Sequence, residues 1–299
     1  RLRLALIMVG RFRRLAYPRA LRAFPHWLRR VLRRSGGGES TDEFRVAGRL
    51  AVLGNRFNDH SNYFHFWMDT IGDLAFLRET LPEDRQPTHF LVSHGGAPWQ
   101  DEILAMAGIA SEQVIRFTDH DRIHADELMV PIREKGGDHL LPALVDAIRN
   151  TVKVPVPDPA GPTRLYVSRA ESPRRRLENE VDVRALLASR GFQICQLTGL
   201  SVREQMELFA AAEVIVAPHG AGLTNLMWCR EGIRVVELLP ERHRVPCFLD
   251  ICTRRGLRHE TVVCTQAAGE RGLTAPMQAP VDELESCIDR LLVEIECEA

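Results

Sequence analysis

This sequence of 299 residues has no pair of cysteines separated by two residues and no long apolar run, and each absence argues against a class of structure. The seven cysteines are an odd number and none forms a Cys-x-x-Cys pair, which argues against a disulfide framework and a structural zinc site. A reducing compartment is the simplest interpretation, so we expect a cytoplasmic protein. The apolar run at residues 2–9 is too short to span a membrane and is interrupted by Arg3.

Several motifs that would identify other enzymes are also missing. The chain has no Gly-x-Gly-x-x-Gly, no P-loop, no His-Glu-x-x-His and no Gly-x-Ser-x-Gly. These absences argue against a nicotinamide-dependent oxidoreductase, a P-loop nucleotide site and a serine hydrolase. The net charge of −1 argues against nucleic acid as a partner.

The basic residues are nearly all arginine, because lysine occurs only at positions 135 and 153. Residues 1–38 contain eleven arginines and no acidic residue. Within them, residues 20–34 mix apolar and arginine side chains in a pattern typical of a basic amphipathic helix on an anionic membrane. The alternative is a helix packed on the protein with its arginines in solvent, and Pro18 and Pro25 interrupt either helix.

Two stretches divide the chain. Residues 35–38 (Ser-Gly-Gly-Gly) form a flexible break, and residues 154–162 contain four prolines and a glycine, which is typical of a stiff linker. The predicted divisions are a basic segment (1–38), an α/β domain (39–153), a Pro-rich linker (154–163), a second α/β domain (164–280) and a C-terminal helix (281–299).

Apolar periodicity predicts alternating strands and helices in both halves. Strands are expected at residues 49–53, 89–93, 114–117, 127–131, 165–168, 193–196, 214–217, 235–239 and 261–264. Helices are expected at residues 61–79, 98–108, 139–152, 180–190, 201–211, 221–229, 245–255 and 281–296. Repeated strand–helix steps imply parallel, doubly wound sheets, so we infer two Rossmann-like domains facing across a cleft.

Residues 214–226 combine a buried strand, a glycine-rich turn and the start of a helix. A helix N-terminus exposes unpaired N–H groups, and Gly220 and Gly222 allow close approach of a ligand, so the segment suits a diphosphate. The alternative is a tight turn that needs glycine only for packing. Side chains that can add hydrogen bonds here belong to His219, Thr224 and Asn225.

Charged residues near other strand ends fit the same ligand. Glu237 lies in an apolar strand, where its two oxygens suit the hydroxyls of a ribose or, alternatively, an ion pair with arginine. Ser168 and Arg169 end a strand and Arg175 precedes a helix, and arginine matches phosphate geometry. For each arginine the alternative is a solvated surface charge.

Together these residues resemble the signature of glycosyltransferase family 61. The matching segments are Leu165-Tyr166-Val167-Ser168-Arg169, then Arg175 with Asn179-Glu180, then His219-Gly220-Ala221-Gly222-Leu223-Thr224-Asn225, Val236-Glu237, and Asn62-Tyr63-Phe64-His65-Phe66-Trp67-Met68-Asp69. The resemblance covers roughly residues 45–265. It implies a GT-B fold, an inverting mechanism, a nucleotide-sugar donor (often UDP-linked) and neither a required metal nor a cofactor.

The N-terminal motif carries the candidate catalytic groups. His65 and Asp69 are four residues apart and share one helix face, which Asp73 continues. A His–Asp pair can remove the proton of an acceptor hydroxyl, and either member can be the base. Asn62 caps the helix or contacts the acceptor, and Trp67 either packs in the core or stacks on a sugar.

A metal site made of His60, His65 and Asp69 is the rival interpretation of this segment, although the spacing matches no zinc motif. The favoured function is transfer of a sugar from a nucleotide-sugar, with UDP as the expected nucleotide, to a hydroxyl of a glycan or glycolipid in bacterial surface polysaccharide (capsule) synthesis. The alternative is an inactive nucleotide-binding regulatory or scaffold protein.

Overall fold

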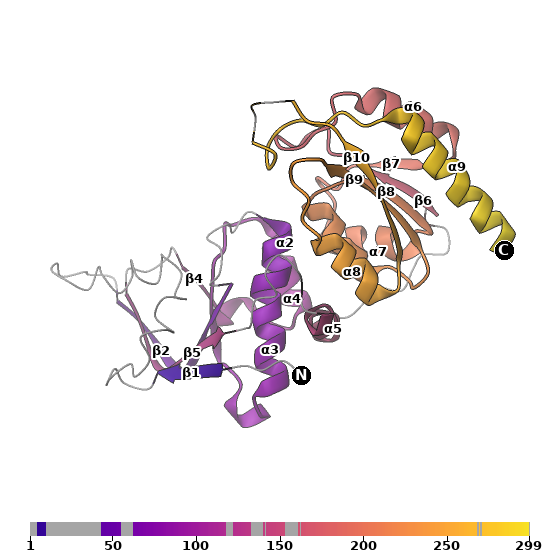
Figure 1. Cartoon of the computed structure of the whole chain (residues 1–299). Helices are drawn as coiled ribbons and strands as arrows, with labels where there is room; N and C mark the ends of the chain where they lie inside the picture. Colours follow the sequence, from indigo (N-terminus) through magenta and orange to yellow (C-terminus); the bar gives the residue numbers. More distant parts are fainter. Residues whose placement is uncertain are drawn as a thin grey trace. The chain divides into compact units, whose positions relative to one another are not determined.

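The computed structural model describes residues 5–9, 43–54, 62–117, 122–132, 140, 142–152, 161, 163–267, 269 and 271–298. The chain divides into two compact units, residues 1–135 with 143–153, and residues 136–142 with 154–299 (Figure 1). The expected basic helix at residues 20–34, His60, and most of the expected linker at 154–163 lie outside the described residues.

The first unit contains a five-stranded sheet in the order β1-β5-β2-β3-β4. Its strands are β1 (Ala5–Val9), β2 (Glu43–Leu53), β3 (His89–Val92), β4 (Val114–Arg116) and β5 (Arg122–Ile132). Strands β2 to β5 are parallel, and β1 pairs with β5 in the antiparallel direction. The sequence did not predict β1, because an isolated apolar run carries no signal for its distant partner strand.

Helical segments connect the strands of this unit. The chain between β2 and β3 forms α2 (Tyr63–His65), a π-helical segment η2 (Phe66–Ile71), α3 (Gly72–Thr80) and a 3-10 turn η3 (Glu83–Arg85). The remaining helices are α4 (Pro98–Met106), η4 (Ser111–Gln113) and α5 (Pro142–Thr151). A single regular helix was expected at residues 61–79, but its middle is π-helical, a rare conformation found mostly at functional sites.

The second unit contains a wholly parallel sheet in the order β10-β9-β8-β6-β7. Its strands are β6 (Arg164–Val167), β7 (Gln193–Cys195), β8 (Val214–Pro218), β9 (Arg234–Pro240) and β10 (Arg258–Cys264). The chain leaves β6 for β7 on one side and returns to β8 on the other. The strand order therefore reverses between β6 and β8, which is where open α/β sheets bind ligands.

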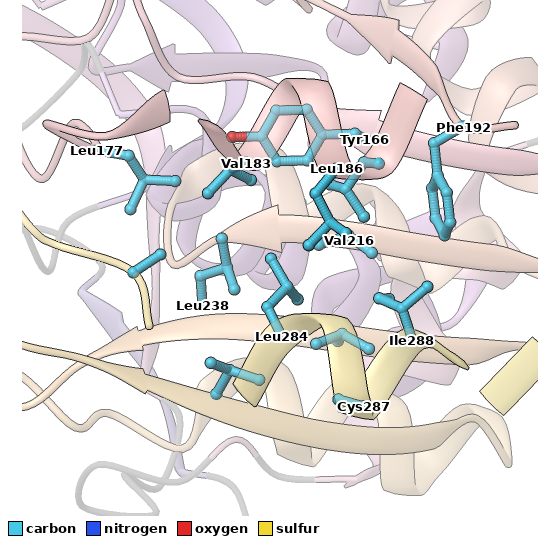
Figure 2. Close-up of a cluster of buried hydrophobic side chains, with 14 of the residues drawn as sticks. Tyr166, Leu177, Val183, Leu186, Phe192, Val216, Leu238, Leu284, Cys287 and Ile288 are labelled. Atoms are coloured by element: carbon cyan, nitrogen blue, oxygen red, sulfur yellow. The ribbon is translucent and has the colours of Figure 1, made fainter. Parts of the chain in front are cut away.

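Helices cover both faces of this second sheet. Figure 1 shows α6 (Glu180–Ser189) and α9 (Val281–Glu298) on one face and α7 (Val202–Ala211) and α8 (Cys247–Arg255) on the other. Figure 2 shows Leu284 and Ile288 of α9 and Val183 of α6 packed with the strand residues Tyr166 and Val216. The C-terminal helix, expected as a separate element, is thus part of the core of this unit.

The expected helix at residues 221–229 is a 3-10 helix, η5 (Ala221–Trp228). Its bonds span three residues, as in the 2.9 Å bond from the N–H of Leu223 to the carbonyl of Gly220. The Thr224 hydroxyl donates to the Ala221 carbonyl at 2.6 Å and reinforces this tight winding. Apolar spacing at three and four residues does not distinguish the two helix types, so the sequence pattern could not predict this outcome.

Candidate functional site

The carboxyl ends of β6 and β8 bring two of the sequence motifs together. Ser168 and Arg169 follow β6, and His219 and Gly220 follow β8, at the point where the strand order reverses. A Cβ added to Gly220 would overlap the guanidinium of Arg169, so the absence of a side chain at Gly220 makes room for the arginine. The two motifs, separated by 50 residues of sequence, therefore form one site.

Arg169 has no carboxylate partner among the described residues. Its Nη2 donates to Ser172 Oγ at 2.8 Å and to the Arg174 carbonyl at 3.1 Å, while its buried Nε makes no hydrogen bond to a described residue. Burial, and then the positive charge of Arg175, lower the pKa of Arg169 to about 10. A positive charge held in this way favours binding of an anion, which would supply the missing partner.

Arg175 also contacts the His219–Gly220 turn. Its Nε donates to the His219 carbonyl at 3.3 Å and its Nη1 to the Leu273 carbonyl at 2.5 Å. Burial, and then repulsion from Arg174, lower the pKa of Arg175. Its φ of 53° is in the left-handed region, which is strained for a residue with a side chain and is commonest at functional sites.

A buried carboxylate holds the histidine of the turn. Glu237 Oε1 contacts His219 Nδ1 at 2.5 Å, and Glu237 Oε2 contacts His259 Nε2 at 2.8 Å. The Glu237 side chain is 2% exposed. The ribose contact expected from the sequence therefore has no available carboxylate oxygen in this conformation, and the partners are histidines rather than the arginine of the alternative. His259 had no readable spacing in the sequence, and only the sheet brings it to Glu237.

Other residues of the two motifs support the backbone from within. The Ser168 hydroxyl donates to Glu180 Oε1 at 2.6 Å and is buried, so Glu180 fixes the end of β6. The Asn225 amide donates to Gln205 Oε1 at 3.1 Å, and Asn225 and Thr224 are fully buried. The side chains of Thr224 and Asn225 therefore stabilise η5, whereas the sequence had suggested that they donate hydrogen bonds to a ligand. Leu223 is also buried, and Ala221 begins η5.

A pocket of about 170 Å³ lies beside Arg169 at this edge of the sheet. Its lining comes from the segments after β6 and β7 and from η5, and includes Ser172, Leu197, Thr198 and Gly222. A Cβ on Gly222 would lie 2.7 Å from Leu197 Cδ1, so a larger residue at this position would make the Leu197 side chain shift. The pocket is smaller than the 300–1,000 Å³ common for drug-sized ligands, and suits a phosphate-sized group.

In the first unit, the structure joins the two residues expected to be catalytic. His65 Nδ1 lies 3.1 Å from Asp69 Oδ2 across the junction of α2 and η2. The His65 side chain is 28% exposed and that of Asp69 11%. Asn62 caps the helix, since its Oδ1 accepts bonds from the N–H groups of Phe64 and His65 at 3.0 and 3.3 Å. The buried Asp73 accepts a bond from the Gly54 N–H at 3.1 Å and so joins the helix to the end of β2.

Aromatic side chains surround the start of this helix. Trp67 is 0% exposed, so it packs in the core and cannot provide the acceptor surface proposed for it from the sequence. Tyr63 and Trp99 are partly buried, with ring centres 5.5 Å apart in an edge-to-face pair. Trp99 is the second residue of α4 and was not predicted as a site residue, although it follows the His94-Gly95-Gly96 segment at the end of β3.

No group of three or more His, Cys, Asp or Glu residues in the part of the chain that the structure describes could hold a metal ion. Among the same residues, no helix combines the length and apolar character needed to cross a membrane.

Comparison with known proteins identifies the family. The family model described as Glycosyltransferase 61 matches residues 63–236, which include the His65–Asp69 pair and the Arg169–Gly220 site. No curated protein sequence matches the chain. The matched range covers more than half of the 299 residues, so the chain belongs to glycosyltransferase family 61 and is a glycosyltransferase.

Proposed function

We propose that the second unit binds a nucleotide-sugar donor, with UDP as the nucleotide, and that its diphosphate lies where β6 and β8 end. The observation that carries the proposal is the pair formed by Arg169 and Arg175, two half-buried guanidiniums that both lie against the His219–Gly220 turn. Neither makes an ion pair with a described carboxylate. A diphosphate would supply the missing negative charge and accept from both forks.

The reaction proposed is a direct displacement that inverts the anomeric centre. A base takes the proton of the acceptor hydroxyl, whose oxygen forms a bond to the anomeric carbon. The bond from that carbon to the diphosphate oxygen breaks, and its electron pair leaves with the nucleotide. Arg169 and Arg175 stabilise the charge on the departing diphosphate, which is the task that a metal ion performs in many transferases.

His65 is the proposed base and Asp69 its partner. Both can accept a proton, but His65 is the more exposed of the two, while Asp69 is largely enclosed by the π-helical turn. Asp69 would then hold the imidazole ring in one orientation and stabilise it when it is protonated. Phe64, whose ring centre lies 5.4 Å from that of His65, would contact the acceptor sugar in place of Trp67.

A GT-B arrangement is part of this proposal. Each unit has a sheet that is parallel apart from β1 in the first unit, and in each unit the candidate residues follow the carboxyl ends of strands or lie in the helix that comes next. Two such edges facing a common cleft would bring the donor diphosphate and the base to one anomeric carbon. Closure of the cleft would exclude water from the reaction.

The first experiment is calorimetric titration of the purified chain with UDP, GDP, CMP and NAD, in EDTA. We expect UDP to bind and Arg169→Ala to weaken it about tenfold or more, because charge-assisted hydrogen bonds are lost. Arg203→Ala is the matched control, since its side chain is 65% exposed on α7 of the same unit. Binding of NAD alone, or equal affinity in both variants, would contradict a nucleotide-sugar site at Arg169.

The acceptor is proposed to be a glycan or lipid-linked glycan of a bacterial surface polysaccharide, such as a capsule, made at the cytoplasmic side of the inner membrane. The eleven arginines of residues 1–38 support contact with anionic lipid. Flotation with vesicles of anionic and of neutral lipid tests this contact. We expect the full chain, but not residues 39–299, to float with anionic vesicles, and equal recovery of the two would contradict the membrane contact.

A further inference from the structure

Three neighbouring parallel strands place a histidine, a glutamate and a histidine on the same face of the second sheet. Glu237 of β9 is paired with Ala217 of β8 and with Thr261 of β10. His219 lies two residues after Ala217, and His259 two residues before Thr261. Because side chains alternate with a period of two, all three point to one face and form a diagonal across the strands.

Both oxygens of Glu237 are used in this row. The distances are 2.5 Å to His219 Nδ1 and 2.8 Å to His259 Nε2, and both histidine side chains are 5% exposed. Burial raises the pKa of the Glu237 carboxyl, but the two histidine hydrogen bonds outweigh it and lower that pKa overall. An ionised Glu237 accepts both bonds, so the hydrogens lie on His219 Nδ1 and His259 Nε2.

The rest of the surroundings hold the His219 ring without competing for it. Phe248 and His243 lie with their ring centres 5.0 and 5.4 Å from that of His219. Burial, and then the charges of His219 and Arg175, lower the pKa of His243 to about 4, so it is neutral at pH 7. His219 Nε2, on the opposite side of the ring from Glu237, is therefore the nitrogen left for a ligand at the turn.

We propose that His259 is a positioning residue for the donor diphosphate: it holds Glu237, and Glu237 holds His219 so that Nε2 points to a phosphate oxygen. This inference rests on the donor site proposed above. In the complex, His219 would donate from Nδ1 to Glu237 and from Nε2 to a phosphate oxygen, so each ring nitrogen would carry a hydrogen. Without His259, the Glu237 carboxylate loses one of its two fixed contacts and can turn away from His219.

Substitution of His259 by asparagine and by glutamine gives the sharpest test. The glutamine amide can reach the position of Nε2 and donate to Glu237 Oε2, whereas the shorter asparagine cannot. We expect His259→Asn to weaken UDP binding about tenfold, and His259→Gln to retain affinity within about threefold of the unmodified chain. Uridine, which lacks phosphate, should bind both variants equally, because only the diphosphate contacts His219.

Val262→Ala is the control for a purely structural effect. Val262 is a buried residue of the same strand that belongs to the hydrophobic core, and it follows Thr261, the partner of Glu237, so its side chain points to the opposite face of the sheet. Its removal should lower the thermal midpoint without changing the affinity for UDP. Equal UDP affinity in the Asn and Gln variants would overturn the role of His259. So would a loss of uridine affinity as large as the loss of UDP affinity. The titration of Arg169→Ala tests the donor site itself and does not depend on His259. If the unmodified chain binds no nucleotide, the donor site and this inference both fail.

Discussion

The two units each contain a histidine joined to a carboxylate, but the two arrangements differ in origin and in surroundings. His65 and Asp69 are four residues apart on one helical segment, 3.1 Å from each other and partly exposed. His219 and Glu237 come from neighbouring strands, are separated by 2.5 Å and are almost fully buried, with His259 as a third member.

This difference separates two kinds of chemistry. A partly exposed histidine can meet a substrate hydroxyl and exchange a proton with it, which a general base must do. A buried row with a fixed carboxylate cannot exchange freely with solvent, but it can hold one ring nitrogen in a constant direction. We therefore expect substitutions in the first unit to reduce turnover and substitutions in the second to reduce donor affinity and stability.

The largest expected effect is on turnover. His65→Ala should lower kcat by about 10²- to 10⁴-fold, because the proposed general base is removed, while the Kd for UDP stays unchanged. Initial rates at saturating donor, together with calorimetry of UDP, measure both quantities in one preparation. An unchanged kcat would contradict the assignment of catalysis to His65–Asp69 and of donor binding to His219–Glu237. If the unmodified chain binds UDP but shows no turnover, the alternative of an inactive regulatory or scaffold protein is favoured.

Burial should make the second pair far more costly to disturb. Glu237→Gln should lower the free energy of unfolding by about 2–3 kcal/mol, since charge-assisted bonds to two buried histidines are lost. Asp69→Asn, the matched change in the first unit, should cost only about 0.5 kcal/mol, because that pair is partly solvated. Urea denaturation of both variants gives the comparison. Equal losses would show that burial does not explain the difference.

The stability supplied by Glu237 should depend on pH in a defined direction. Its pKa in the folded protein lies below the ordinary value of 4.5, so the contribution is fully present above pH 4.5 and is lost as the pH falls through the folded-state pKa. Each unit of lowering corresponds to about 1.4 kcal/mol. The difference in unfolding free energy between the unmodified chain and Glu237→Gln should thus shrink below pH 4.5 and stay constant from pH 5 to 6.

The smallest effect concerns the cap that begins the first helix. Asn62→Ala removes the acceptor of two backbone N–H groups and should cost about 1 kcal/mol of stability. Since His65 is one of the capped residues, we also expect a modest fall in kcat. Asn62→Asp, which keeps the acceptor oxygen, should restore both properties. If Asn62→Ala lowers the acceptor affinity without a loss of stability, Asn62 contacts the acceptor instead.

Local pattern was sufficient for much of the fold. Apolar alternation and turn residues predicted nine strands, and the structure confirms each of them as β2 to β10, with ends shifted by up to a few residues. The same patterns could not distinguish the 3-10 helix after Gly220 or the π-helical turn at Asp69 from α-helix, because all three place apolar residues three to five positions apart. The strand β1 was missed for lack of any local sign of its partner.

The sequence by itself determined the family, the parallel α/β character and the pairing of His65 with Asp69, since these depend on spacing within short segments. Only the tertiary structure decided that Arg169 lies against Gly220, that Glu237 binds two histidines and that Trp67 is buried. The physical reason is that hydrogen bonds and burial depend on distance in space. Parallel strands bring together residues whose separation along the chain carries no periodic signal.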